Sequence, residues 1–232
     1  MLRKRKGAAF MPLNLAIDGP VGAGKSTIAS EVARHLGILH LDTGAMYRAV
    51  GYQALREGVD PGDEDAVTAL CGRIRLTVRH AQDGQHTLVD GEDVTGKIRT
   101  EEVSMAASTV AKYAGVREAM VALQRHLASE TAMLLDGRDI GTRVLPEATV
   151  KIFLTASAEE RARRRYAELA RKGAPDTYEQ VLDDLRRRDR QDMNRAVDPL
   201  RPAADAVTLD TTDMTFDQVV ETILEIVKER AQ

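Results

Sequence analysis

The sequence predicts an α/β fold in which helices cover both faces of a mostly parallel sheet. Short apolar runs alternate with helical patterns at least four times along the 232 residues, as repeated strand–helix units do. Residues 19–26 read G-P-V-G-A-G-K-S, which fits the spacing G-x-x-x-x-G-K-[ST] of a phosphate-binding loop. This loop lies between an apolar run and a helical pattern, the context that the motif requires.

The elements around the loop follow from apolar spacing. A first buried strand is expected at residues 13–17, and the helix after the loop repeats apolar residues from Ile28 to Leu36. Gly37 ends that helix, because glycine readily adopts the left-handed C-cap conformation. A second strand is expected at residues 38–41, followed by another helix.

A change of period marks residues 73–97. Ile74, Leu76 and Val78 alternate with polar residues, as in a half-buried strand. Asp83-Gly84 and Asp90-Gly91 are turn sequences. We therefore expect a small antiparallel insertion between helices.

The second half of the chain returns to strand–helix alternation. Helices are expected at 101–113, 115–129, 158–171 and 177–194, with a terminal helix after residue 213. Strands are expected at 132–135, 150–154 and 206–209.

Composition excludes several classes of protein. Tryptophan is absent, aromatic residues make up 3% and the net charge is −3, which argues against a general nucleic-acid or anionic-membrane binder. Cys71 is alone and the histidines lack a metal-ligand spacing. No apolar run approaches the ~20 residues of a membrane helix. We expect a cytoplasmic monomer without nucleic-acid or membrane partners, with residues 1–11 as a disordered tail.

The phosphate-binding loop carries the clearest chemistry. Its glycines let backbone N–H groups surround phosphate oxygens at a helix N-terminus. Lys25 can reach the outer phosphates, and the Ser26 hydroxyl can ligate Mg²⁺. The alternative is a chance match, which the strand–loop–helix context disfavours.

Ligands of open α/β sheets lie beyond the carboxyl ends of the strands. The residues there are Gly19–Ser26, Asp42–Arg48, Asp136–Asp139 and Asp210–Asp213. Asp136 closes an apolar run, where a carboxylate could hold Mg²⁺ through water. The alternative is an aspartate that caps a helix.

Arginines are concentrated on two predicted helices. Arg161, Arg164, Arg165 and Arg171 lie on the first. On the second, a stripe at three- and four-residue steps begins apolar and ends charged: Tyr178, Val181, Leu185, Arg188, Asp192 and Arg195. We expect its charged end to line a crevice, because a face that is core at one end should not simply become exposed to solvent. Phosphoryl transfer between two phosphorylated molecules would need several cations there. The alternative is an exposed face of salt bridges.

These motifs together resemble the bacterial cytidylate kinases, the CMP kinase branch of the nucleoside monophosphate (NMP) kinases. The resemblance covers nearly everything from Leu13 onward and rests on residues 19–26, 41–48, 90–94, 136–142 and 188–196. It implies a P-loop NTPase three-layer fold with a five-stranded parallel sheet. It also implies an NMP-binding region at about 42–130, enlarged by the insertion at 73–97, and a short helical lid at about 158–195, within one kinase domain over 12–232.

The resemblance implies an ATP:CMP phosphotransferase that also accepts dCMP and uses Mg²⁺. ATP would bind Gly19, Pro20, Val21, Gly22, Ala23, Gly24, Lys25, Ser26 and Thr27. The acceptor phosphate would bind Arg48, Arg138 and Arg195, the cytosine Ser108, Arg117 and Asp139, and the sugar Arg188 and Asp192. Thr43 stands where some relatives carry serine and keeps the hydroxyl. Lys25, Arg138, Arg188 and Arg195 would be catalytic, Ser26 and Asp136 (through water) would hold the metal, and Arg164 and Arg165 match the lid loosely.

Two other functions remain open. One is a kinase for another nucleotide or small metabolite, and the other is a nucleotide-dependent switch without catalysis. Three arginines at the acceptor site favour a phosphorylated acceptor, and a switch would leave Arg48, Arg138 and Arg195 without a role.

Overall fold

The computed structural model describes residues 12–171 and 173–231. The tail predicted over residues 1–11 lies outside this range. The elements follow one another as β1 (Asn14–Asp18), α1 (Lys25–Leu36), β2 (Leu39–Asp42), α2 (Thr43–Glu57), α3 (Glu64–Arg73), β3 (Leu76–Ala81), β4 (Gly84–Val89), β5 (Glu92–Asp93), α4 (Glu101–Val110), α5 (Ala114–Glu130), β6 (Met133–Gly137), the π-helical turn η1 (Ile140–Val144), β7 (Val150–Thr155), α6 (Ala158–Arg171), α7 (Tyr178–Asn194), β8 (Val207–Asp210) and α8 (Phe216–Arg230).

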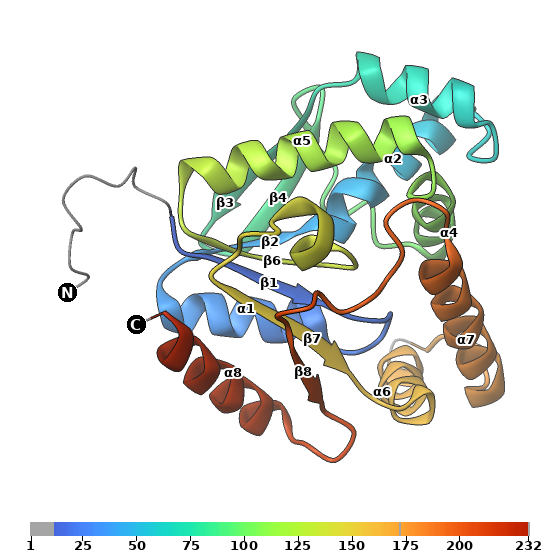
Figure 1. The fold of residues 1–232 in the computed structure, drawn as a ribbon. Helices are drawn as coiled ribbons and strands as arrows, with labels where there is room; N and C mark the ends of the chain where they lie inside the picture. Colours follow the sequence, from blue (N-terminus) through green and yellow to red (C-terminus); the bar gives the residue numbers. More distant parts are fainter. Residues whose placement is uncertain (1–11, 172, 232) are drawn as a thin grey trace.

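Five strands form a parallel sheet in the order β2-β6-β1-β7-β8. In the centre, Leu15 of β1 pairs with Leu134 of β6, and Ile17 of β1 pairs with Ile152 of β7. Figure 1 shows α1 and α8 on one face of the sheet and α2 and α5 on the other. The predicted α/β fold with a five-stranded parallel sheet is confirmed.

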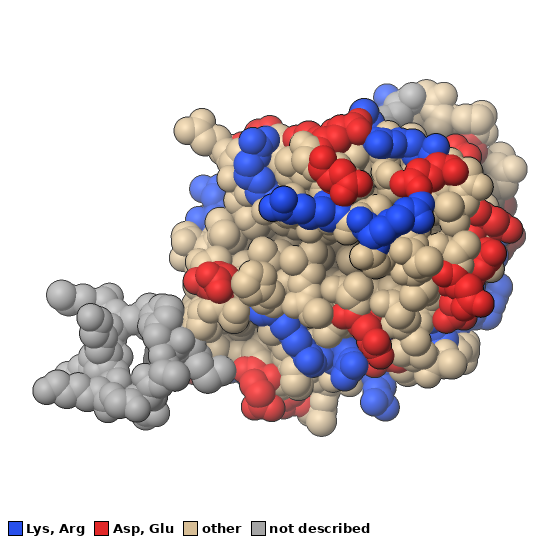
Figure 2. Space-filling view, turned by 90° about the horizontal axis from the view of Figure 1, so that it is seen from above, with Lys and Arg blue, Asp and Glu red and all other residues tan. Residues whose placement is uncertain are grey.

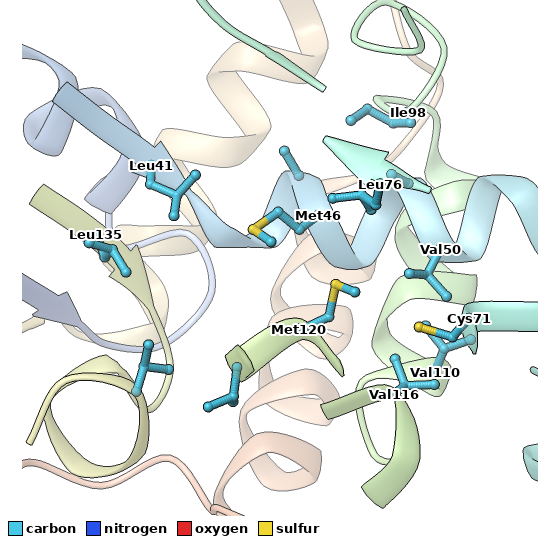
Figure 3. Close-up of a cluster of buried hydrophobic side chains, with 14 of the residues drawn as sticks. Leu41, Met46, Val50, Cys71, Leu76, Ile98, Val110, Val116, Met120 and Leu135 are labelled. Atoms are coloured by element: carbon cyan, nitrogen blue, oxygen red, sulfur yellow. The ribbon is translucent and has the colours of Figure 1, made fainter. Parts of the chain in front are cut away.

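Each face of the sheet has its own hydrophobic core. On the face of α1 and α8, Ile17, Val32 and Ile223 are buried together. On the opposite face, Met46 of α2 and Met120 of α5 join a larger cluster (Figure 3). Strands buried on both faces have little freedom to slide, so the residues at their carboxyl ends are held in fixed positions.

The predicted antiparallel insertion is confirmed as a three-stranded sheet in the order β3-β4-β5. Leu76 pairs with Val89, and both side chains are buried in the core shared with α2. The alternation that predicted this sheet arises because only one side of each strand faces that core.

Two local features differ from the sequence prediction. Helix α3 was not predicted, although Asp63 caps it by accepting a hydrogen bond from the Ala66 N–H at 3.0 Å. Ile74, expected in a strand, instead follows α3 at its C-cap. The buried face of α3 is limited to Val67, Leu70 and Cys71, so its helical period extends over little more than one turn. The other predicted helices and strands are present within a few residues of their expected bounds.

Helices α6 and α7 form an antiparallel pair beyond the end of β7 (Figure 1). A small cluster of Ala162, Val181 and Leu185 holds them together. Among the described residues, no helix is long and apolar enough to cross a membrane. Figure 2 shows Lys and Arg side chains beside Asp and Glu across the face seen from above, rather than a field of one sign.

Candidate active site

A pocket of about 340 Å³ opens at the carboxyl ends of β2 and β6, beside the phosphate-binding loop. From the predicted ATP site it is lined by Val21, Gly22, Gly24, Lys25, Ser26 and Thr27. From the predicted acceptor and metal sites it is lined by Thr43, Arg48, Ser108, Arg117, Asp136, Arg138, Asp139, Arg188, Asp192 and Arg195. Gly19, Pro20 and Ala23 are not among its lining residues. The two sets of residues therefore share one pocket.

Backbone geometry explains the glycines of the loop. Gly19, Gly22 and Gly24 have φ angles of 154°, 76° and 83°, values that residues with a Cβ rarely adopt. A Cβ on Gly19 would also lie 2.0 Å from the Leu154 carbonyl oxygen of β7. Gly24 is the N-cap of α1, so free backbone N–H groups of the helix face the pocket.

Lys25 begins α1 and is almost fully buried at the base of the pocket. Its Nζ donates to the Pro20 carbonyl oxygen at 2.8 Å. Burial and the nearby Arg138 cation lower the pKa of Lys25 to about 7. A polyanion bound in the loop would favour the charged ammonium and offset both effects.

Two oxygen donors suited to Mg²⁺ lie side by side in the pocket. The Ser26 hydroxyl donates to Asp136 Oδ2 at 2.7 Å, and His40 Nε2 lies 2.8 Å from Asp136 Oδ1. Burial opposes ionisation of Asp136, but the hydrogen bond and charge of His40, the charge of Lys25 and the Ser26 hydrogen bond together keep its pKa below the usual value. In the described part of the chain, no group of three or more His, Cys, Asp or Glu side chains could hold a metal. One hydroxyl and one carboxylate fit a magnesium ion whose other ligands are water and phosphate.

The arginines of the acceptor side are paired with carboxylates. Arg48 Nη2 lies 2.8 Å from Asp42 Oδ2, and Arg138 Nε lies 2.7 Å from Asp192 Oδ2. The Nε of Arg48 is buried and has no hydrogen-bond partner. A buried donor without a partner in a pocket indicates a place for a ligand acceptor.

Asp139 lies between two further arginines. Its Oδ2 accepts a hydrogen bond from Arg117 Nη2, and its Oδ1 accepts from Arg195 Nη2 at 3.1 Å. The Arg117 side chain is 2% exposed and that of Arg195 is 5% exposed, so both depend on these carboxylate oxygens to compensate for lost water. The charged end of the α7 stripe lines the crevice, as we expected.

Two hydroxyls on the acceptor side bond to the protein. Thr43 Oγ1 donates to the Asp136 carbonyl oxygen at 2.7 Å. Ser108 Oγ accepts from Gln191 Nε2 at 2.7 Å, which links α4 to α7 across the pocket.

The arginines of α6 have separate environments. Arg164 donates from Nη2 to the Thr211 carbonyl oxygen at 2.6 Å and is outside the pocket lining. Arg165 lines a neighbouring cavity of about 600 Å³, together with Val21 and Arg188. Arg161 is buried and donates from Nη1 to the Val21 carbonyl oxygen at 2.9 Å. This hydrogen bond connects α6 to the backbone of the phosphate-binding loop.

Sequence reasoning missed several residues that support the site. Asp18 accepts hydrogen bonds at 2.7 Å from the backbone N–H groups of both Ile140 and Gly141. His40, Gln191 and Asp198 also contact predicted site residues. A motif match could have directed attention to Asp18, which precedes the loop directly, but the other three stand in no recognisable pattern.

A five-stranded parallel sheet, with a glycine loop and a buried lysine between its central strand and the first helix, defines the class of P-loop nucleotide-binding proteins. The family model "Cytidylate kinase" matches residues 15–229. The chain therefore belongs to the cytidylate kinase family, and like that family it is a kinase.

Cytidylate kinases from other bacteria align with almost the whole chain. The cytidylate kinase of Shouchella clausii is 51% identical over 94% of this chain and 97% of its own length. The cytidylate kinase of Bacillus subtilis is 48% identical over 95% of this chain and 98% of its own length. An uncharacterized protein from Eubacterium ventriosum has a TM-score of 0.51 at 11% identity, covering 94% of this chain and 99% of its own. That likeness shows the fold alone.

Proposed function

We propose that the protein transfers the γ-phosphoryl group of ATP to CMP or dCMP, giving CDP or dCDP. The observation that carries this proposal is one pocket with two anion sites: the phosphate-binding loop with Lys25, and the arginines Arg48, Arg138 and Arg195. A transfer between two phosphorylated molecules needs both. Membership of the cytidylate kinase family supports CMP as the acceptor.

The donor side acts by positioning and charge. The backbone N–H groups of the loop and the Lys25 ammonium hold the β- and γ-phosphates. Ser26 would hold Mg²⁺ directly and Asp136 through water. When bound, Mg²⁺ neutralises charge on the phosphate oxygens.

The acceptor side holds the phosphate that attacks. Arg48, Arg138 and Arg195 bind its oxygens, and Arg188, which lines the pocket from α7, contacts the sugar. Ser108, Arg117 and Asp139 read the cytosine, and Asp192 contacts the sugar. The pair α6–α7 serves as a lid that excludes water, since water would otherwise accept the phosphoryl group.

A coupled assay for ADP release tests this function, with each NMP offered in turn at saturating ATP. Turnover with CMP and dCMP, and little with UMP, AMP or GMP, is the expected result. Turnover with another phosphorylated acceptor alone would replace CMP by that acceptor. ADP release that is independent of any acceptor would contradict the kinase assignment of the pocket.

A further inference from the structure

Asp198 lies in the loop after α7 and contacts two arginines of the pocket without lining the pocket itself. Its Oδ2 accepts a hydrogen bond from Arg117 Nε at 3.0 Å. Its main-chain oxygen accepts one from Arg195 Nε at 2.6 Å. One residue therefore holds both arginines, the first through its side chain and the second through its backbone.

The same two arginines are held at another nitrogen by Asp139. Arg117 Nη2 bonds to one carboxylate oxygen of Asp139, and Arg195 Nη2 bonds to the other. A planar guanidinium fixed at Nε and Nη2 has a defined orientation. The Nη1 of Arg117 makes two longer hydrogen bonds of 3.4 Å, to the Tyr47 hydroxyl and the Ala111 carbonyl oxygen, so every nitrogen of this guanidinium has a partner in the protein.

The backbone of Asp198 is unusual. Its φ angle is +47°, in the left-handed region that residues with a Cβ rarely occupy and that Asp and Asn tolerate best. Pro199 follows and restricts the backbone of the residue before it. Such a conformation persists where surrounding contacts hold it in place, and here those contacts include the bond from Arg195.

We propose that Asp198 is a positioning residue that orients Arg117 and Arg195 for the acceptor nucleotide, an inference that rests on the proposed CMP kinase function. The carboxylate aligns the arginine of the base site, and the left-handed backbone turns the carbonyl oxygen toward the arginine of the phosphate site. Asp198 thereby sets the geometry of both ends of the acceptor without touching it.

Three substitutions test this inference through steady-state kinetics with ATP and CMP. Asp198→Ala removes the carboxylate and disfavours the left-handed backbone. We expect it to raise KM for CMP about tenfold while KM for ATP stays within about twofold. Asp198→Gly keeps the backbone and removes only the carboxylate, so its loss should be smaller. Asp198→Asn keeps an acceptor oxygen and tolerates the backbone, so it should restore KM for CMP to within about threefold of the wild type.

Asp90→Ala is the matched control. Asp90 also has a left-handed backbone, with a φ angle of +51°, and it lies in the β4–β5 turn outside the pocket lining. This variant should lose thermal stability to a degree similar to Asp198→Ala but leave both KM values unchanged.

Other outcomes would overturn the inference. Unchanged KM for CMP in Asp198→Ala, or a parallel rise of KM for ATP, would assign Asp198 a structural role only. Equal losses in the Gly and Ala variants would remove the backbone part of the proposal. Failure of the proposed function is distinguishable, because the wild-type protein would then show no turnover with CMP in the first place.

Discussion

The two anion sites that we propose for the pocket, a donor site and an acceptor site, are built in different ways. The donor site comes from nine consecutive residues, Gly19 to Thr27, and relies on backbone N–H groups and one lysine. The acceptor site is assembled from α2, α4, α5, the end of β6 and α7. Two of its arginines are fixed by carboxylates that lie far away in sequence, Asp192 for Arg138 and Asp139 for Arg195, whereas the partner of Arg48 is the nearby Asp42.

The donor site thus depends mainly on residues close together in sequence, and the acceptor site depends on contacts between distant segments. Lys25 is buried with a carbonyl oxygen as its hydrogen-bond partner, and its lowered pKa shows that its charge is poorly compensated before an anion binds. Arg138 and Arg195 already have carboxylate partners. A bound phosphate would therefore stabilise the charge of Lys25 in the donor site. In the acceptor site, carboxylates already hold the arginines in position. Changes on the two sides should have separable effects.

The largest effect is expected for Lys25→Ala. Loss of one cation from a phosphoryl-transfer site should reduce kcat at least about 10²-fold, or roughly 3 kcal/mol. CMP affinity, measured by calorimetry, should change little because Lys25 is on the donor side. Lys97→Ala in the exposed insertion is the control. Near-normal turnover in a folded Lys25→Ala variant would mean that this loop does not bind the donor.

Asp18 connects the donor side to the acceptor side of the pocket. It precedes the phosphate-binding loop, and its carboxylate accepts hydrogen bonds from the two backbone N–H groups that follow Asp139. Burial raises its pKa from 3.8 to about 6, so the folded protein binds this proton more tightly than the unfolded chain. The contribution of Asp18 to stability is therefore largest below about pH 4 and declines as pH rises toward 6. Relative to Asp18→Asn, the wild type should lose about 3 kcal/mol of unfolding free energy over this range. Urea unfolding of both proteins at pH 4.5 and pH 7 should show about 2 kcal/mol of this change, because part of the stabilisation is already lost at pH 4.5. A pH-independent difference would contradict the raised pKa.

Arg195→Lys keeps the charge of the acceptor side but not its planar fork. Lysine cannot bond to Asp139, the Asp198 carbonyl oxygen and a phosphate in one plane, so kcat/KM for CMP should fall more than about tenfold. KM for ATP should remain near that of the wild type. Arg190→Lys, exposed on the same helix and outside the pocket lining, is the matched control. Equal, small effects of both substitutions would remove Arg195 from the acceptor site.

The smallest effect concerns base selection. Cytosine presents an amino group where uracil presents a carbonyl oxygen, and the Asp139 carboxylate can accept only from the former. Asp139→Asn should lower the CMP-to-UMP ratio of kcat/KM about tenfold, roughly 1.4 kcal/mol. A folding defect affects both substrates equally and cancels in the ratio. An unchanged ratio would mean that Asp139 only orients the arginines.

Most of the fold could be predicted because its signals are local. The apolar runs of β1 and β6 and the helical period of α8 stand out in the sequence. Helix α3 was missed because its buried face is limited to Val67, Leu70 and Cys71. The residues that line the pocket were predicted through motifs, but their partners were not. Arg161 is an example of what sequence pattern could not predict. An arginine at this position of a helix can be exposed, but here the side chain is buried and bonds to the Val21 carbonyl oxygen.

The sequence by itself determined where the phosphate-binding loop lies, since its glycine spacing and the start of α1 are found in consecutive residues. It also determined the sheet, through strands apolar enough to be buried on both faces. Only the tertiary structure decided which carboxylate holds which arginine. Asp198 and Arg117 are 81 positions apart, and no local preference sets such a pair. Arg117 lies on α5 and Asp198 in the loop after α7, and the tertiary fold brings the two together. Burial of the guanidinium requires such a partner for the hydrogen bonds it loses to water.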